Sequence, residues 1–201
     1  MSLPALQYPN GISYEDFLAT VDEGTHAEWV DGRVVPMTPP SKEHLRITAF
    51  LLAALRGYVN RKKLGGIVLH APAQMKLERS GREPDVIYLC PQTMERWGER
   101  FVEGPADLVV EVVSPESRFR DRREKFREYQ DAGVAEYWLI DPEQRTAEVY
   151  ARSDAGVFAP VPAGDPARLR SVVLPGLWID PDWLWSELPD EWVAYEAWGL
   201  I

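Results

Sequence analysis

The pattern of apolar and polar residues predicts short strands that alternate with helices along most of the chain. One strand-forming run, residues 108–113, is apolar except for Glu111. A run that is apolar on both sides of the pleat is typical of a central strand covered on both faces. An ionised Glu loses its hydration there unless a positive group lies beside it, so Glu111 is the first candidate functional residue.

A second strand pattern surrounds Asp31-Gly32, a dipeptide that favours a tight turn. Apolar and polar residues alternate on both sides of this turn, so residues 28–37 are predicted to form a β-hairpin. Glu28 lies on its first strand. An exposed acid in such a hairpin commonly pairs across it, here with Arg33, so a structural role for Glu28 stays open.

A third pattern, residues 67–77 and 85–89, predicts an antiparallel pair joined by a polar turn at 78–82. Asp85 follows Pro84 at the start of the second strand. Adjacent strands can bring Asp85 and Glu111 together, although Asp85 can also simply cap a turn. Residues 91–104 form a polar insert, either a short helix or a flap.

Two long segments have helical patterns. Ser41 is the expected N-cap of a helix that extends to about Lys63. The second helix covers residues 116–132 and has Lys125 one turn before Tyr129, which directs both toward one side. The stripe expected to be buried on the first helix consists of Leu45, Thr48, Leu51, Leu52, Leu55 and Val59.

The remaining strands complete a mixed α/β fold. Residues 136–141 and 146–151 predict an antiparallel pair, and residues 171–174 predict another strand. The unit from 108 to 140 is expected to form a right-handed parallel crossover. We therefore predict a mixed central sheet flanked by helices.

Length and charge limit the class of protein. The chain has 201 residues, 45% of them hydrophobic, which favours one domain over residues 1–201. A net charge of −10 argues against nonspecific coating of nucleic acid by the whole surface, but allows a local basic cleft. With one cysteine, Cys90, and no signal peptide or membrane span evident, a cytoplasmic protein is expected.

The last part of the chain, residues 176–201, is rich in tryptophan. This tail can wrap the domain and complete its core, or present indole rings at a subunit interface. We expect a mixture of the two, with a homodimer as the assembly. The five tryptophans are Trp178, Trp183, Trp185, Trp192 and Trp198.

An ordered set of motifs covers most of the chain: Glu28 with Asp31-Gly32, Pro84-Asp85, Glu111 to Pro115, Lys125, Tyr129, and Glu136 to Pro142. This set resembles the Uma-type family of putative restriction endonucleases, within the PD-(D/E)xK nuclease superfamily. The resemblance implies a restriction-endonuclease-like core, a divalent metal, Mg²⁺ or Mn²⁺, and hydrolysis of DNA phosphodiester bonds.

The chain departs from the superfamily pattern at Val113, where a lysine normally stands two positions after the acid. In related proteins this lysine can move to the following helix, and Lys125 resembles that arrangement. Arg122 and Arg123 are the alternatives. Lys125 could also lie on the solvated face of a charged helix.

The resemblance then implies roles for the individual residues. Lys125 is expected to orient the attacking water or the phosphate. The expected metal ligands are Asp85, Glu111, the Val112 carbonyl and Glu28. The expected substrate contacts are His44, Arg122, Arg123 and Tyr129.

Two other functions stay open. In the first, the fold is retained with weak or no catalysis, and the protein is a binding module that recognises a protein partner through the tail. In the second, it is a metal-free acid–base hydrolase, which needs two carboxylates with separated pKa values in a closed pocket.

Overall fold

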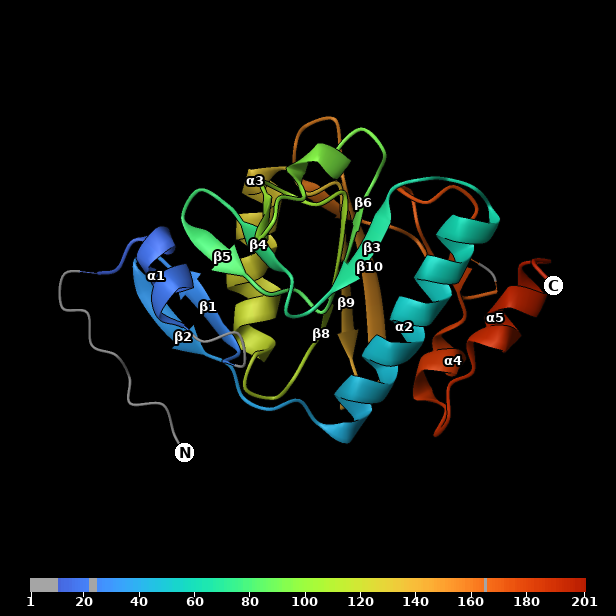
Figure 1. The fold of residues 1–201 in the computed structure, drawn as a ribbon. Helices are drawn as coiled ribbons and strands as arrows, with labels where there is room; N and C mark the ends of the chain where they lie inside the picture. The colour runs from blue at the N-terminus through green and yellow to red at the C-terminus, as the bar shows by residue number, and fades with distance from the viewer. Residues whose placement is uncertain (1–10, 22–24, 165) are drawn as a thin grey trace.

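A six-stranded sheet with the order β11-β10-β9-β8-β6-β3 forms the centre of the fold (Figure 1). The computed structural model describes residues 11–21, 25–164 and 166–201. Strands β8 and β9 are parallel and the other neighbours are antiparallel, so the predicted mixed sheet is confirmed. Its strands are β3 (Ile67–His70), β6 (Val86–Leu89), β8 (Leu108–Val112), β9 (Glu136–Asp141), β10 (Thr146–Arg152) and β11 (Phe158–Pro160).

Helices cover both faces of this sheet. Helix α2 (Lys42–Arg61) packs with the C-terminal helices α4 (Pro181–Trp185) and α5 (Glu191–Ala197) in a core that includes Val86 and Val110. The opposite face, with Ile87 and Val109, packs against α3 (Phe126–Ala132). Because successive side chains of a strand alternate between faces, this central sheet is apolar on both sides.

A smaller sheet, with the order β2-β1-β5-β4-β7, lies beside the first. The hairpin at its edge confirms the prediction from Asp31-Gly32, whose φ angles of 49° and 78° suit its tight turn. Helix α1 (Tyr14–Thr20), capped by Ser13, contributes to a small core beside it. The strands are β1 (Ala27–Val30), β2 (Arg33–Pro36), β4 (Gln74–Lys76), β5 (Ser80–Arg82) and β7 (Phe101–Glu103).

The segment 67–82 differs from its prediction. Instead of one strand and a polar turn, it forms β3, β4 and β5, and only β3 pairs with β6. The break falls around Pro72, which has no N–H to donate to a ladder. Strand β5 is polar in sequence, so its three buried residues gave no strand signal. The insert after β6 contains a short 3-10 helix, η1 (Met94–Arg96), before β7.

Both predicted helices exist with changes. Ser41 caps α2 as expected, but Leu45 is 56% exposed, and the buried stripe instead includes Ile47 and Phe50. The second helix begins later than predicted, with a π-helical segment η2 (Arg120–Lys125) that continues into α3.

The C-terminal tail mainly completes the core. Trp198 is buried and Trp178, Trp183 and Trp185 are half-buried against the α2 side, whereas Trp192 is 53% exposed. The predicted strand at 171–174 is wrong: the strands there are β12 (Leu169–Arg170) and β13 (Trp178–Ile179). None of the helices in the described ranges is long and apolar enough to cross a membrane.

Candidate active site

Strand pairing brings the two expected carboxylates together. Val86 lies opposite Val110 in the antiparallel pair β6–β8, and continuing this register places Asp85 opposite Glu111. Asp85 Oδ2 accepts a hydrogen bond from the Val112 N–H at 2.6 Å. Asp85 and Glu111 both line a cavity of about 300 Å³.

The helix after β8 adds a cation to this pair. The Lys125 Nζ atom lies 2.8 Å from Glu111 Oε1, 3.0 Å from Glu28 Oε1 and 3.6 Å from Asp121 Oδ1. One turn later, the Tyr129 hydroxyl donates to the same Glu111 oxygen at 2.7 Å. The i, i+4 spacing therefore directs both side chains onto Glu111, and Lys125 is fully buried instead of lying on a solvated helix face.

A serine turn sets the direction of this helix. Ser114 N–H donates to Ser117 Oγ at 2.9 Å, and Ser117 N–H donates to Ser114 Oγ at 3.1 Å. These reciprocal bonds satisfy backbone donors where Pro115 ends the strand. The chain thus turns at the cavity, and η2 brings Asp121 and Lys125 back over the end of β8.

Glu28 has a different environment from the one expected of a metal ligand. It is completely buried, and its two oxygens face Lys125 and the Arg82 guanidinium, the latter at 3.0 Å. In the hairpin it lies opposite Val35, so it does not pair with Arg33. Glu28 is not among the residues that line the cavity, and it acts on the site through Lys125.

The charges of the cluster are coupled. Burial raises the pKa of Glu28, but Lys125 and Arg82 together outweigh burial and lower it to about 2. Burial lowers the pKa of Lys125, but Glu111, Glu28 and Asp121 outweigh burial and raise this pKa above its usual range. Burial also raises the pKa of Glu111, against the influence of Lys125. The carboxylates around Lys125 therefore favour its charged form, and Glu111 is the carboxylate of the cluster whose ionised form burial disfavours.

The donor set fits a metal only in part. Among the described residues, no group of three His, Cys, Asp or Glu side chains is arranged to hold a metal ion. Asp85 and Glu111 remain as a pair, and Glu111 Oε2 accepts no hydrogen bond from the described residues. Magnesium commonly binds through one or two carboxylates and keeps several waters. Asp85 and Glu111 fit such an ion. Glu28 does not fit it, because both of its oxygens face cations of the protein. Val112 was expected to offer its carbonyl to the metal, and the contact that the structure shows is from its N–H to Asp85.

The expected substrate contacts separate into two groups. His44 lines the cavity, and its Nε2 lies 2.7 Å from Asp85 Oδ1. Arg123 is exposed. Tyr129 has no exposed surface, and Arg122 pairs with Glu148 at 2.6 Å. Tyr129 and Arg122 therefore have internal partners and do not face the cavity. His44 faces the cavity while it contacts Asp85, and Arg123 is exposed.

The sequence analysis did not identify several residues of the candidate site. Arg82 links Glu28 to Glu128, because β1 pairs with β5, and no local pattern indicates that long-range contact. Asp121 lies four residues before Lys125, a spacing that could have been recognised. His26 and Glu83, whose side chains are 2.6 Å apart, also line the cavity.

Comparisons with known proteins agree with this architecture. The family model Uma2, described as a putative restriction endonuclease, matches residues 14–182. A solved structure of a putative nuclease belonging to DUF820 from Anabaena variabilis superposes with a TM-score of 0.70, at 17% identity, over 88% of this chain and 99% of that chain. The uncharacterized protein slr1290 of Synechocystis is 26% identical over 179 residues, which are 85% of this chain and 90% of that protein.

Proposed function

The chain belongs to the Uma2 family of putative restriction endonucleases, and from that premise we propose that it is a metal-dependent endonuclease that hydrolyses DNA phosphodiester bonds. One observation carries the proposal. Lys125, from the helix after β8, contacts Glu111 beside Asp85 at the edge of a single cavity. Two neighbouring acids can hold a metal ion, and a lysine beside them can stabilise the charge that develops when a phosphodiester is hydrolysed.

We propose that Asp85 and Glu111 hold Mg²⁺ or Mn²⁺. The bound ion would stabilise the negative charge that develops on the phosphate and would lower the pKa of a bound water. The residues themselves prepare that site. The Val112 N–H and His44 fix both oxygens of Asp85, while Tyr129 fixes one oxygen of Glu111.

Lys125 would stabilise the negative charge on the phosphate and would not act as a proton acceptor. Its pKa lies above the usual lysine range, so it stays protonated at neutral pH and cannot serve as a general base. Its ammonium can donate to a phosphate oxygen that enters the cavity. Glu28 and Arg82 are positioning residues in this scheme, since Glu28 holds the ammonium and Arg82 holds Glu28.

The assembly proposed for this enzyme is a homodimer. Most of the tail tryptophans pack inside the protein, so deletion of the tail would damage the core. An interface would instead use the exposed apolar side chains Leu188, Trp192 and Val193. Light scattering of Trp192→Asp should show a monomer if this surface is the interface, and a monomeric wild type would end the idea.

Cleavage assays test the proposed activity. Wild type is incubated with double-stranded, single-stranded and branched DNA, in Mg²⁺, in Mn²⁺ and in EDTA. We expect products with either metal and none in EDTA. Calorimetry should show metal binding that Glu111→Gln weakens. If no substrate is cut while a protein partner binds the Trp192 surface, the molecule is a binding module and the nuclease proposal fails.

A further inference from the structure

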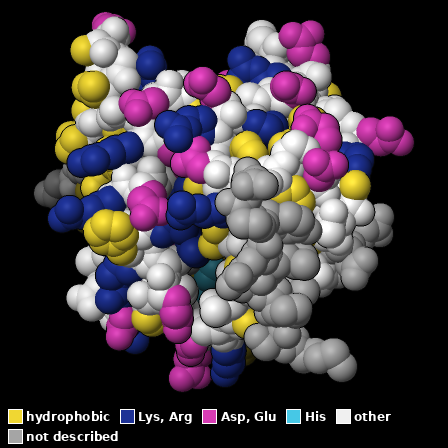
Figure 2. Space-filling model, turned by 90° about the vertical axis from the view of Figure 1, so that its left-hand side faces the viewer, with side chains coloured by type: hydrophobic (Ala, Val, Ile, Leu, Met, Phe, Trp, Pro, Cys, Tyr) yellow, Lys and Arg dark blue, Asp and Glu magenta, His cyan; other side chains and the backbone are white. Residues whose placement is uncertain are grey.

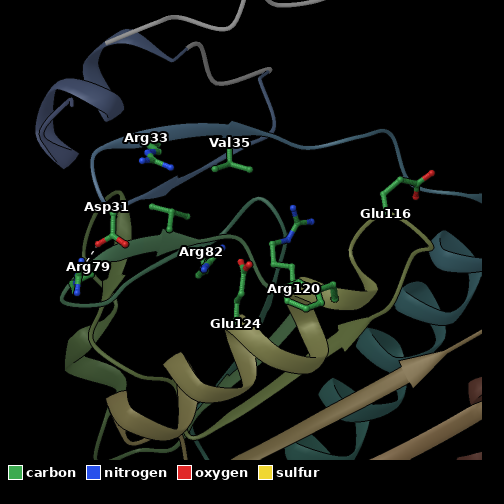
Figure 3. A pocket seen from close by; sticks show the side chains of 10 residues that line it. Asp31, Arg33, Val35, Arg79, Arg82, Glu116, Arg120 and Glu124 are labelled. Carbon is green, nitrogen blue, oxygen red and sulfur yellow. Dashed lines mark hydrogen bonds and ion pairs between the residues drawn. The ribbon is translucent and has the colours of Figure 1, made fainter. Parts of the chain in front are cut away.

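A second hollow lies next to the candidate active site, between the β1–β2 hairpin and η2 (Figure 3). Its volume is about 570 Å³, within the range of roughly 300–1,000 Å³ typical of small-ligand pockets. Figure 2 views the side of the molecule that carries the hairpin, where several Lys and Arg side chains gather. We call this hollow the hairpin groove. The groove residues used below are Arg33, Arg79, Arg82, Phe119 and Arg120.

The arginines of the hairpin groove differ in whether they already have partners. Arg79 pairs with Asp31 at 2.6 Å, and Arg82 is held by Glu28. Arg33 forms no ion pair with any described carboxylate, and it projects from the exposed edge strand β2. Arg120 approaches Glu28 only to 4.0 Å, and its buried Nε has no hydrogen-bond partner in the described part of the chain. The guanidinium groups of Arg33 and Arg120 are thus the two that can bind an anion in the groove.

The groove is not purely basic, which limits what it can bind. Glu116 and Glu124 also line it, and Figure 3 shows Glu124 near Arg82. A long run of phosphates would meet these acids as well as the arginines. A short stretch of backbone, placed between Arg33 and Arg120, fits this distribution of charge better than an extended duplex.

An exposed aromatic ring adds a second type of contact. Phe119 is 63% exposed although it lines the groove, and the Arg123 guanidinium lies 5.6 Å from its ring centroid. Proteins that bind single strands combine a basic groove with aromatic rings on which bases stack. In a duplex both faces of each base are covered by its neighbours, and inserting a ring there costs unstacking energy, so an unpaired base stacks on such a ring at a lower cost.

The groove and the active-site cavity share Arg120. Arg82 gives a second connection, because it lines the groove and contacts Glu28, which contacts Lys125. A strand that contacts Arg120 from the groove would therefore reach Glu111 and Lys125 within a short distance.

We propose that the hairpin groove binds unpaired nucleotides of the DNA strand that is cut, with the phosphates on Arg33 and Arg120 and one base stacked on Phe119. This inference rests on the proposed nuclease function and adds a substrate class to it. The preferred substrate is DNA with a single-stranded segment beside the cleavage position, such as a fork or an overhang.

Binding in EDTA tests the groove without any cleavage. The probes are a short fluorescein-labelled oligo(dT) and a blunt hairpin duplex, measured by fluorescence anisotropy over a series of salt concentrations. Phe119→Ala should weaken oligo(dT) binding by about tenfold, and Phe119→Trp should restore it. Arg33→Ala should reduce the slope of log K against log salt by about 0.7. Both side chains are exposed, so circular dichroism of the variants should match wild type.

The matched controls are Trp97→Ala and Arg56→Ala, which remove an exposed ring next to η1 and an exposed guanidinium from α2. Neither residue lines the hairpin groove or the active-site cavity. These variants should bind oligo(dT) as wild type does. The inference is overturned if Phe119→Ala and Arg33→Ala also bind as wild type, or if Phe119→Ala weakens duplex binding equally.

The cleavage assay separates this inference from the proposed function. If wild type cuts DNA and Phe119→Ala cuts forked and blunt substrates with the wild-type ratio, the groove assignment fails while the nuclease stands. If oligo(dT) binding depends on Phe119 and Arg33 but no DNA is cut, the groove assignment holds and the nuclease fails.

Discussion

Glu111 and Glu136 are buried acids on the neighbouring parallel strands β8 and β9, yet their surroundings differ. Glu136 Oε2 accepts from Ser171 Oγ at 3.1 Å, from Val172 N–H at 2.6 Å and from Val173 N–H at 2.9 Å. The Trp138 indole donates to its other oxygen. Glu111 has two donors on one oxygen, one of them an ammonium, and a second oxygen without a described partner.

The difference shows how a structural carboxylate can be distinguished from a candidate functional one. Neutral donors surround Glu136 and tie the loop at 171–174 to the sheet, so its hydrogen-bonding capacity is used within the protein. Glu111 lines a cavity, has a partly unused carboxylate, and depends on a cation delivered by another element. A buried acid that is incompletely paired and faces a cavity is a candidate for chemistry.

The strand register places the two acids far apart along the neighbouring strands. Leu108 lies opposite Glu136, and Glu111 lies opposite Leu139, so the acids occupy opposite ends of the β8–β9 pair. The end at Glu136 is closed by the loop at 171–174, while the end at Glu111 opens into the cavity with Asp85. One sheet therefore has an end that is closed by its own chain and an end that opens into the candidate active site.

The largest effect is expected at Glu111. Glu111→Gln keeps an acceptor for Tyr129 but removes the charge that binds the metal, so cleavage should fall by about a thousandfold or more. The melting temperature should not fall, because Lys125 keeps Glu28 and Asp121 as partners. Cleavage and thermal unfolding are measured beside Glu143→Gln, the same change at an exposed acid. Normal cleavage by Glu111→Gln would refute the assignment.

The next largest effect on activity is expected at Lys125. Lys125→Met keeps a long apolar stem and removes the ammonium, so turnover at saturating metal should fall by about a hundredfold. Stability should fall as well, because Glu28 loses a buried partner. Single-turnover cleavage is compared with Arg127→Met, an exposed position on the next helix. If turnover is unchanged, Arg120 becomes the candidate for the role.

Glu136 should show the opposite behaviour. Glu136→Ala leaves buried donors from Val172 and Val173 without an acceptor, so the free energy of unfolding should fall by about 3 kcal/mol. Cleavage per folded molecule should stay unchanged, since the site lies at the other end of the strands. Urea unfolding and limited proteolysis near residues 171–174 test this. A loss of turnover without a loss of stability would mean that the two ends are coupled.

The sequence signals at the end of the sheet with Glu111 are mostly local. The single acid in an apolar run indicates Glu111 as a candidate, and the Pro-Asp step places Asp85 at the start of the neighbouring strand, opposite Glu111 in the extended register. Both signals depend on a few consecutive residues and on strand periodicity. The central mixed sheet followed from the same patterns. The family resemblance points to Lys125, which a helix pattern alone would also allow on a solvated face, and the structure brings its ammonium to Glu111.

The errors lie where distant segments meet. The small sheet is built from strands of three or four residues, and its pairing β1–β5 brings Arg82 to Glu28 without any periodic signal. Glu28 therefore resembled a metal ligand in sequence but is neutralised by two cations in the structure. The strand predicted at 171–174 is a loop held by Glu136, and a strand propensity could not reveal that long-range contact.

The last and most diagnostic effect is a dependence of stability on pH. The pKa of Glu111 is raised from 4.5 to about 8 in the folded protein, first by burial and then by Asp121, Asp85 and Glu28 against Lys125. The folded state therefore holds this proton at pH values where the unfolded state has released it. Stability contributed by protonated Glu111 is complete below pH 4.5 and is lost as the pH rises through about 8.

The comparison of wild type with Glu111→Gln isolates this dependence, because Glu83 and Glu136 also have raised pKa values and contribute equally to both proteins. Glu28 has a lowered pKa of about 2, so its contribution is lost only in strong acid. Between pH 5 and 8, wild type should lose stability relative to Glu111→Gln, with a slope of at most about 1.4 kcal/mol per pH unit. Mg²⁺ should flatten the slope, because a cation at Glu111 favours its ionised form. Urea unfolding at several pH values, with and without Mg²⁺, provides the measurement, and parallel curves for the two proteins would show that Glu111 titrates normally.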